Sequence, residues 1–387
     1  MNAVKFEFAT ASRIVFGAGT VNDVGGIARD FGRRALVVTG RDARRAERLL
    51  ANLKSTGIAA VAFPVTGEPE IATVELGTAF AKTENCDFII GIGGGSAMDA
   101  GKAIAAMLTN DGNVLDYVEI IGRGKALTKP SAPFIAIPTT AGTGSEVTRN
   151  AVLSSPEHKL KVSLRSPLML AKVALVDPEL TYDLPPALTA STGLDALTQL
   201  IEPFVCSRAN PMTDGLCVEG IRRAARSLRA AFTDPKNKSA REDMAVAGLF
   251  GGLALANAGL GAVHGFAGPI GGMFPAPHGA ICAVLLPHVM RANLQALRQR
   301  APGGEALRRY DEVGRWLTGN ALATADDGVA WVRKLVGDAQ IPRLGAYGVQ
   351  NEHVAGLVEK ATHASSMKAN PVALSHAELA DALQQAL

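Results

Sequence analysis

The first half of the chain alternates short apolar runs with segments of helical periodicity, and the second half does not. Runs rich in β-branched residues are typical of buried strands, and apolar residues three and four positions apart are typical of helices. Strands that alternate with helices predict a parallel sheet covered on both faces. The expected strands are 34–40, 59–63, 87–92, 134–137 and 173–176, and the expected helices are 42–55, 71–83 and one from the glycines near 94 to about Met107.

The alternation ends near Pro185 and Pro186. Beyond this pair the chain is rich in Ala and Leu, has helical periodicity and contains few β-rich runs. A length of 387 residues fits two domains. We therefore expect an α/β domain over residues 1–184 and an all-helical domain over residues 185–387.

Composition limits the kinds of partner. The net charge is +3 and the basic residues are scattered, so nothing indicates a nucleic-acid partner. The four cysteines form no CxxC pair, which favours reduced thiols in a cytoplasmic protein. The N-terminus has no unbroken apolar region, so no signal peptide is expected.

The segment 245–263 is long enough to cross a bilayer and has one polar residue, Asn257. It consists mostly of Ala and Gly, however, and no Lys, Arg, Trp or Tyr flanks it. Its transfer energy is therefore weak, and we expect a single, tightly packed buried helix and no membrane partner.

A glycine turn, Gly91-Ile-Gly-Gly-Gly-Ser96, follows the third expected strand and opens a helix. Glycines let the backbone approach a phosphate, and the exposed N–H groups at a helix start bind anions. Ser96 with Asp99 resembles a capping box. The turn departs from GxGxxG and follows the third strand, so a purely structural turn is the alternative.

A second polar loop, residues 138–146, follows the fourth expected strand. Its hydroxyls and glycines suit a polar ligand bound at the carboxyl ends of the strands, although an ordinary Ser/Thr turn is the alternative. Two such loops at successive strand ends together favour a nucleotide site.

Candidate metal ligands lie in the second half. Asp195 and Gln199 are four residues apart and share one helix face. His264 is expected at the end of the Ala/Gly helix, and the prolines between it and His278 turn the chain so that both rings face one ion. Carboxylate and imidazole ligands suit Fe²⁺ or Zn²⁺. The alternatives are a helix-start role for Asp195 and a hydrogen-bonded core position for His264.

Taken together, these segments resemble the iron-containing (group III) alcohol dehydrogenase family. The resemblance rests on GIGGGSAMDAGKA (91–103), PTTAGTGSEVT (138–148), TGLDALTQLIE (192–202), VHGFAGPIGGMF with PHGA (263–280), LLPHVMRAN (285–293) and SSMKANP (365–371). It implies a Rossmann-like dinucleotide-binding domain followed by a helical metal- and substrate-binding domain, as in the dehydroquinate synthase-like architecture, with the active site between them. It also implies a homodimer.

The resemblance also implies roles for individual residues. Asp195, His264 and His278 would be catalytic as metal ligands, with Gln199 as the fourth ligand. The cofactor-binding residues would be Gly40, Gly94, Gly95, Ser96, Asp99, Thr139, Thr140, Thr143 and Lys161.

Three positions depart from the common family pattern. Gln199 stands where a third histidine ligand is usual, so metal retention would be weaker. Gly268 stands where many members have a histidine that passes protons. Gly40 replaces an acidic residue that bonds the ribose and repels a 2′-phosphate in NAD enzymes, and Arg41 would pair with that phosphate. We therefore expect NADP(H) to be accepted at least as well as NAD(H).

The expected function is an NAD- or NADP-dependent alcohol dehydrogenase that uses Fe²⁺ or Zn²⁺ to polarise the oxygen of a small alcohol, aldehyde or ketone. A metal-independent reductase resembling maleylacetate reductase is the nearest alternative, because one histidine ligand is missing. A lyase resembling dehydroquinate synthase and a non-catalytic binding protein are weaker alternatives.

Overall fold

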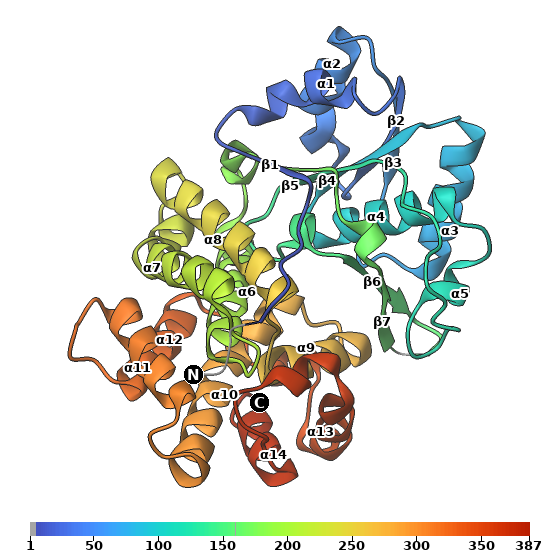
Figure 1. The fold of residues 1–387 in the computed structure, drawn as a ribbon. Coiled ribbons are helices and arrows are strands. Elements are labelled where there is room, and N and C mark those ends of the chain that lie inside the picture. Colours follow the sequence, from blue (N-terminus) through green and yellow to red (C-terminus); the bar gives the residue numbers. More distant parts are fainter. Residues whose placement is uncertain (1–4, 159) are drawn as a thin grey trace. The chain divides into compact units, whose positions relative to one another are not determined.

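The computed structural model describes residues 5–158 and 160–387. The chain divides into two compact units (Figure 1). One unit covers residues 9–182. The other covers residues 183–387, together with the described N-terminal residues 5–8. The division falls two residues before the expected boundary at 184.

The first unit is built on a six-stranded sheet in which every pairing is parallel. Its strand order is β1-β8-β5-β4-β2-β3. The parallel α/β architecture expected from the alternation is confirmed. The strands are β1 (Arg13–Phe16), β2 (Arg34–Thr39), β3 (Ala59–Pro64), β4 (Phe88–Gly93), β5 (Phe134–Pro138) and β8 (Val173–Val176).

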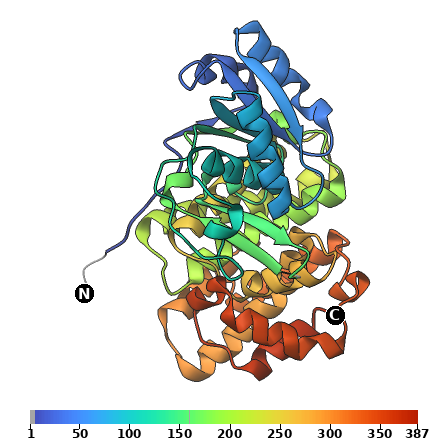
Figure 2. The ribbon, with the colours of Figure 1, turned by 90° about the vertical axis from the view of Figure 1, so that its right-hand side faces the viewer.

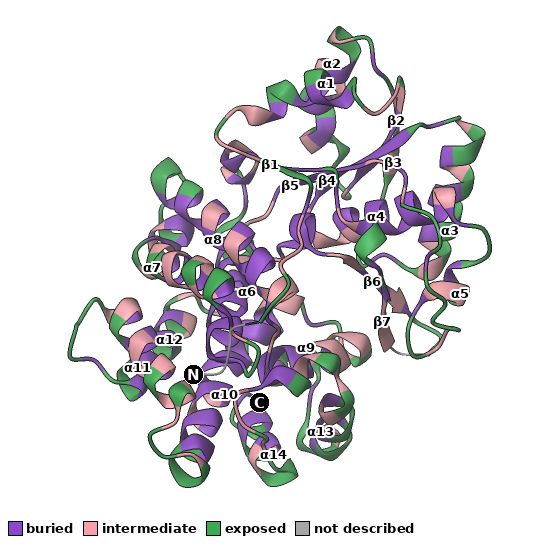
Figure 3. Ribbon diagram, viewed as in Figure 1, coloured by how far each residue is buried: buried purple, intermediate pink, exposed green. Residues whose placement is uncertain are grey.

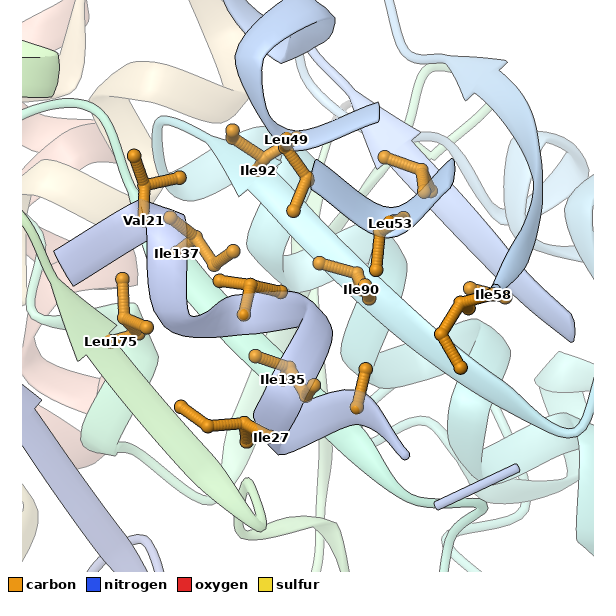
Figure 4. Close-up of a cluster of buried hydrophobic side chains, with 14 of the residues drawn as sticks. Val21, Ile27, Leu49, Leu53, Ile58, Ile90, Ile92, Ile135, Ile137 and Leu175 are labelled. Carbon is orange, nitrogen blue, oxygen red and sulfur yellow. The ribbon is translucent and has the colours of Figure 1, made fainter. Parts of the chain in front are cut away.

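Helices cover both faces of this sheet (Figure 1). On one face, α1 (Val24–Ala28) and α2 (Glu47–Ser55) close an apolar cluster over the strands (Figure 4). Leu49 and Leu53 of α2 pack there with Ile90 of β4 and Ile135 of β5, and all four side chains are fully buried. The other face carries α3 (Ile71–Thr83) and α4 (Gly95–Thr109). Because both faces are covered, the central strands are apolar throughout and carry no alternation.

Two elements of this unit lie outside the sheet. A short helix, α5, covers Val114–Tyr117. An antiparallel hairpin joins β6 (Asn150–Ser155) to β7 (Leu160–Arg165). Neither β1 nor this hairpin is among the expected strands.

The second unit is helical, and residues 183–387, all of which are described, contain no strand. The all-α domain is therefore confirmed. Figure 2 shows its C-terminal helices, orange to red, packed together, and Figure 3 shows that α6 and α10 are mostly buried. The helices are α6 (Pro186–Val205), α7 (Pro211–Thr233), α8 (Lys238–Asn257), α9 (Ala262–Met273), α10 (His278–Arg300), α11 (Glu305–Thr318), α12 (Ala325–Asp338), α13 (Val354–His363) and α14 (His376–Gln384).

The expectation of one continuous helix over 245–263 is wrong. Helix α8 ends at Asn257, α9 begins at Ala262, and the two are bent by 98°. Gly259 lies in the break with φ +148°, a backbone conformation that residues other than glycine rarely adopt. Apolar periodicity continues across the break, so the pattern alone does not locate it.

One described helix, α10, has the length and composition to cross a membrane, and the bent pair α8 and α9 passes the same test when taken together. The most apolar window of α10 is 83% buried inside the protein. Such burial is typical of a core helix.

Candidate functional site

The first candidate site lies at the carboxyl edge of the parallel sheet. Gly93 ends β4 opposite Pro138 of β5, and Thr39 of β2 pairs with Ile92. The loops that follow these strands therefore meet at one edge, where ligands of open α/β sheets bind. The backbone N–H of Thr139 donates to the carbonyl of Gly93 (2.8 Å), which joins the two predicted cofactor loops directly.

Close packing explains the glycines of the first loop. A Cβ on Gly93 would lie 2.7 Å from Cβ of Ala97, and one on Gly95 would lie 3.0 Å from the methyl of Thr143. Thr140 lies 3.7 Å from where a Cβ of Gly94 would be, which is an ordinary contact distance. The structure thus brings the two loops together, and a larger side chain at Gly95 would crowd Thr143 of the second loop.

Helix α4 begins in this loop, and its N-cap is Gly94, which provides no side-chain cap. The expected capping box of Ser96 and Asp99 is wrong. Both residues lie within the first turns of the helix. The N–H groups of this first turn are consequently left for an anion, as at other helix starts that hold phosphate.

Asp99 has partners inside the protein. Its carboxylate accepts hydrogen bonds from the Ser145 hydroxyl (2.5 Å) and the Val152 N–H (3.1 Å), and it lies 3.2 Å from Nζ of Lys102. These bonds tie α4 to the second loop and to β6. A direct cofactor contact by Asp99 stays a prediction.

The remaining predicted cofactor residues lie on other elements. Lys161 is on β7, and its Nζ lies 3.1 Å from a carboxylate oxygen of Glu68. Gly40 follows β2, with its backbone near Gly93 and no described heavy atom within 4 Å of where its Cβ would be. Their cofactor roles also stay predictions.

The second candidate site lies in the helical unit and gathers four side chains from three helices. Asp195 projects from the middle of α6, His264 is in the first turn of α9, and His278 begins α10. Cys282 follows His278 by one turn of α10 and so shares its face. The placement of His264 corrects the expectation that it ends the preceding helix.

One donor atom from each of these four residues lies within 4.8 Å of the other three. Nε2 of His264 is 3.5 Å from Oδ1 of Asp195, and Nε2 of His278 is 3.7 Å from the same oxygen. The cluster therefore has the size of a coordination shell. The sequence prediction that Asp195, His264 and His278 converge holds in this geometry.

Three of the four residues of the cluster are buried, and one oxygen of Asp195 lacks a hydrogen-bond partner in the part of the chain that the structure describes. Asp195 is 1% exposed, and its Oδ1 has no hydrogen-bond partner among the described residues. A buried carboxylate oxygen without a hydrogen-bond donor is costly, because it has lost its hydration and no hydrogen bond replaces it. The donor set of carboxylate, two imidazoles and a thiol fits a divalent transition metal, which would supply the missing partner.

The electrostatics of the cluster agree with a cation site. Burial alone would raise the pKa of Asp195, but the two histidines and the Gln199 amide reverse this, and its pKa is lowered. Burial lowers the pKa of His264, while the neighbouring thiol and carboxylates raise it by more, so that its pKa lies well above the ordinary value. The negative groups of the cluster thus favour positive charge at its centre.

Glu202 is a further residue of this site that is absent from the predicted ligands. Its Oε2 lies 2.6 Å from Nδ1 of His264, and its Oε1 accepts from the N–H of Val263 (2.8 Å). A carboxylate only accepts, so the ring donates through Nδ1 and turns Nε2 toward Asp195. Glu202 follows Asp195 by seven residues in α6, and that helical spacing is the signal from which it could be found.

Gln199 lies beside the cluster. It is 2% exposed and interacts with the Asp195 carboxylate. Its Oε1 has no hydrogen-bond partner among the described residues and lies next to Gly251 of α8. Its role as a ligand stays a prediction.

Two family models match the chain. Residues 11–178 match "Iron-containing alcohol dehydrogenase", and residues 189–387 match the C-terminal model of the Fe-containing alcohol dehydrogenase family. Relatives include the 1,3-propanediol dehydrogenase of Klebsiella pneumoniae, 36% identical over 98% of each chain. Another is the long-chain-alcohol dehydrogenase 1 of Geobacillus thermodenitrificans, 39% identical over 81% of this chain and 78% of that one.

Solved structures agree with these sequence matches. A 1,3-propanediol oxidoreductase superposes with a TM-score of 0.92 at 35% identity, covering 99% of this chain and all of that one. A sulfoacetaldehyde reductase from Bifidobacterium kashiwanohense in complex with NAD⁺ superposes with a TM-score of 0.87 at 29% identity, covering 99% of each. The chain belongs to the iron-containing alcohol dehydrogenase family and is an oxidoreductase that acts on CH–OH groups.

Proposed function

We propose that the protein is an NADP(H)-accepting alcohol dehydrogenase in which Asp195, His264 and His278 hold a divalent metal that polarises the substrate oxygen. The substrate is a small alcohol in one direction and an aldehyde or ketone in the other. The observation that carries the proposal is the buried, unpartnered Oδ1 of Asp195, which lies 3.5 and 3.7 Å from two imidazole nitrogens.

When bound, the metal supplies a Lewis acid that lowers the pKa of the alcohol, and the nicotinamide accepts the hydride. Residues of this chain orient the metal ligands and bind the cofactor. Glu202 fixes the ring of His264 so that Nε2 is turned toward the cluster. The N–H groups at the start of α4 bind the pyrophosphate of the dinucleotide, with Gly94, Gly95 and Ser96 providing the close approach.

The proton released from the alcohol leaves through solvent. Gly268 follows His264 by one helical turn, and no described heavy atom lies within 4 Å of where its Cβ would be. This open position has no side chain to pass a proton. The side chain of His278 is 36% exposed and provides a route from the cluster to water.

Cofactor preference follows from the end of β2. Gly40 carries no carboxylate to repel a 2′-phosphate. Arg41 is exposed, whereas Arg44 is held by Asp42 at 2.9 Å. Arg41 is therefore the guanidinium that pairs with the phosphate of NADP(H).

The test is a steady-state comparison of kcat/KM for NADP⁺ and NAD⁺ across methanol, 1,3-propanediol, choline and a long-chain alcohol. We expect NADP⁺ to be used at least as well as NAD⁺, and Gly40→Asp to shift the ratio toward NAD⁺ by about tenfold or more. A hundredfold preference of the wild type for NAD⁺, about 2.7 kcal/mol, would contradict the cofactor proposal.

The same assay after chelation separates the metal mechanism from the metal-independent reductase. We expect activity to disappear with the metal and to return when Zn²⁺ or Fe²⁺ is added. Full activity in metal-free protein would favour the reductase, which the absence of a histidine at Gln199 already suggests as the alternative.

We propose further that the enzyme is a cytoplasmic homodimer. The four cysteines are free and buried, which suits a reducing compartment, and the family resemblance supports the dimer. Light scattering on the purified chain tests the dimer, since a monomeric mass at micromolar concentration would contradict it.

A further inference from the structure

The buried thiol of Cys282 is the member of the metal cluster that is absent from the predicted ligands. Cys282 is fully buried, and its Sγ lies 3.7 Å from Nε2 of His278 and 3.9 Å from Nε2 of His264. The other three cysteines lie outside the cluster. Its position follows from the sequence: His278 begins α10, and the residue four positions later points the same way.

The distances between the donor atoms are slightly longer than the edges of a coordination tetrahedron. Zinc bonds of about 2.0–2.1 Å to nitrogen or oxygen and about 2.3 Å to sulfur give donor-to-donor edges of about 3.3–3.6 Å. Four of the six donor-to-donor distances in the cluster measure 3.5, 3.7, 3.7 and 3.9 Å, and all six are within 4.8 Å. A small contraction of these side chains would therefore bring all four donors within bonding distance of an ion, and the substrate oxygen would add as a fifth ligand.

We propose that Cys282 is the fourth protein ligand of the metal and takes the place that Gln199 leaves open. The inference rests on the proposed metal site and specifies its donor set: one carboxylate, two imidazoles and one thiolate. Gln199 then acts on Asp195 through its amide, with its Oε1 beside Gly251.

A thiolate ligand has a consequence for metal choice. Thiolate is a soft donor, and it adds to the preference for Zn²⁺ over Fe²⁺ that a site of imidazole and carboxylate already has. The thiol loses its proton when the metal binds. This chain is therefore expected to be a zinc-selective member of an iron-named family.

The experiment uses the full chain, freed of metal by chelation and reloaded with Co²⁺. A cobalt–thiolate bond gives an intense near-ultraviolet charge-transfer band, which nitrogen and oxygen ligands do not give. We expect one Co²⁺ per chain with this band in the wild type and in Gln199→Leu. The matched control is Cys217→Ser, which alters a fully buried thiol of the same unit outside the cluster, and it should keep the band.

Cys282→Ser should lose the band and weaken Zn²⁺ affinity by more than the 10–100-fold typical of losing an outer-shell partner. X-ray absorption of the zinc-loaded wild type gives a second readout that needs no variant, with one sulfur expected at about 2.3 Å. Stoichiometric Co²⁺ without the band, or a band that survives in Cys282→Ser, overturns the cysteine ligand and leaves the proposed function standing. Absence of Co²⁺ and Zn²⁺ binding overturns both.

Discussion

Two buried polar clusters, one in each unit, differ in whether their atoms have partners. In the α/β unit, Lys102 is 1% exposed, and its Nζ donates to the carbonyl of Ser145 and the hydroxyl of Thr148, each at 2.9 Å. It also donates to the carbonyl of Asn150 at 2.5 Å and lies 3.2 Å from Asp99. This ammonium group is thus fully engaged within the protein.

In the helical unit, by contrast, Oδ1 of Asp195 and Oε1 of Gln199 are buried and have no hydrogen-bond partner among the described residues. Both clusters bury charge, and burial of charge without partners costs several kcal/mol. The Lys102 cluster offsets that cost internally and is therefore a structural device. The Asp195 cluster leaves two buried oxygens without such partners in the described part of the chain, which supports the proposed metal site.

The largest effect is expected from Asp195→Asn, which keeps the size of the side chain and removes its charge. Metal content should fall close to zero, and kcat/KM should drop by about a thousandfold or more, or ~4 kcal/mol. The metal-free variant should be less stable than metal-free wild type, because the histidines and the Gln199 amide that lower the pKa of Asp195 stabilise its charged form in the folded protein. Elemental analysis and urea unfolding measure both. Asp99→Asn is the matched control and should keep its metal.

Lys102→Met tests the other side of the comparison. Removing the ammonium leaves Asp99 without its cation and several buried oxygens without a donor, so the α/β unit should lose about 3–5 kcal/mol of stability. Metal binding to the helical unit should be unchanged. Lys54→Met, at an exposed position of the same unit, should have little effect. A variant of Lys102 as stable as wild type would show that the cluster is not structural.

Glu146, in the second loop of the α/β unit, gives a pH-dependent test. Burial raises the pKa of Glu146 to about 7 from an ordinary value of 4.5. The pKa of Glu146 is higher in the folded protein than in the unfolded chain. Burial of Glu146 therefore carries no electrostatic penalty below pH 4.5, and the free energy of unfolding falls as the pH rises from 4.5 toward 7. Glu146→Gln should therefore gain up to about 3 kcal/mol over wild type between pH 4.5 and 7. Urea midpoints whose difference does not change with pH would contradict this.

The smallest effect is expected from Glu202→Gln. An amide in place of the carboxylate weakens the bond that orients His264, so metal affinity should fall about 10–100-fold while the site persists. Competition with a chelator of known affinity measures the change. If affinity is unaltered, Glu202 is a structural partner only.

Most of the fold could be predicted because long apolar runs mark the central strands, which are buried on both faces. The edge strand β1 has only four residues, and its side chains are half exposed or exposed, so its pattern is weak. The hairpin β6–β7 mixes polar residues with apolar ones in short strands. The break between α8 and α9 depends on the backbone conformation of Gly259, which periodicity does not report.

The site was only partly predictable, because metal ligands meet in space and not in sequence. Asp195, His264 and His278 stand out through family motifs. The role of Cys282 depends on α10 beginning at His278, and the role of Glu202 depends on α9 bringing His264 onto the face of α6, although its helical spacing from Asp195 was visible in the sequence. Asp99, in turn, has the sequence context of a ligand-binding loop, yet its oxygens bond to Ser145 and Val152.

The central claim is that the cluster of Asp195, His264, His278 and Cys282 binds a metal ion. Titration calorimetry of the chelator-treated full chain with Zn²⁺ tests it most directly. One ion per chain should bind to the wild type, and no ion should bind to Asp195→Asn at the same protein concentration. A wild type that binds no Zn²⁺, or an Asp195→Asn variant that binds it as tightly as wild type, would contradict the account.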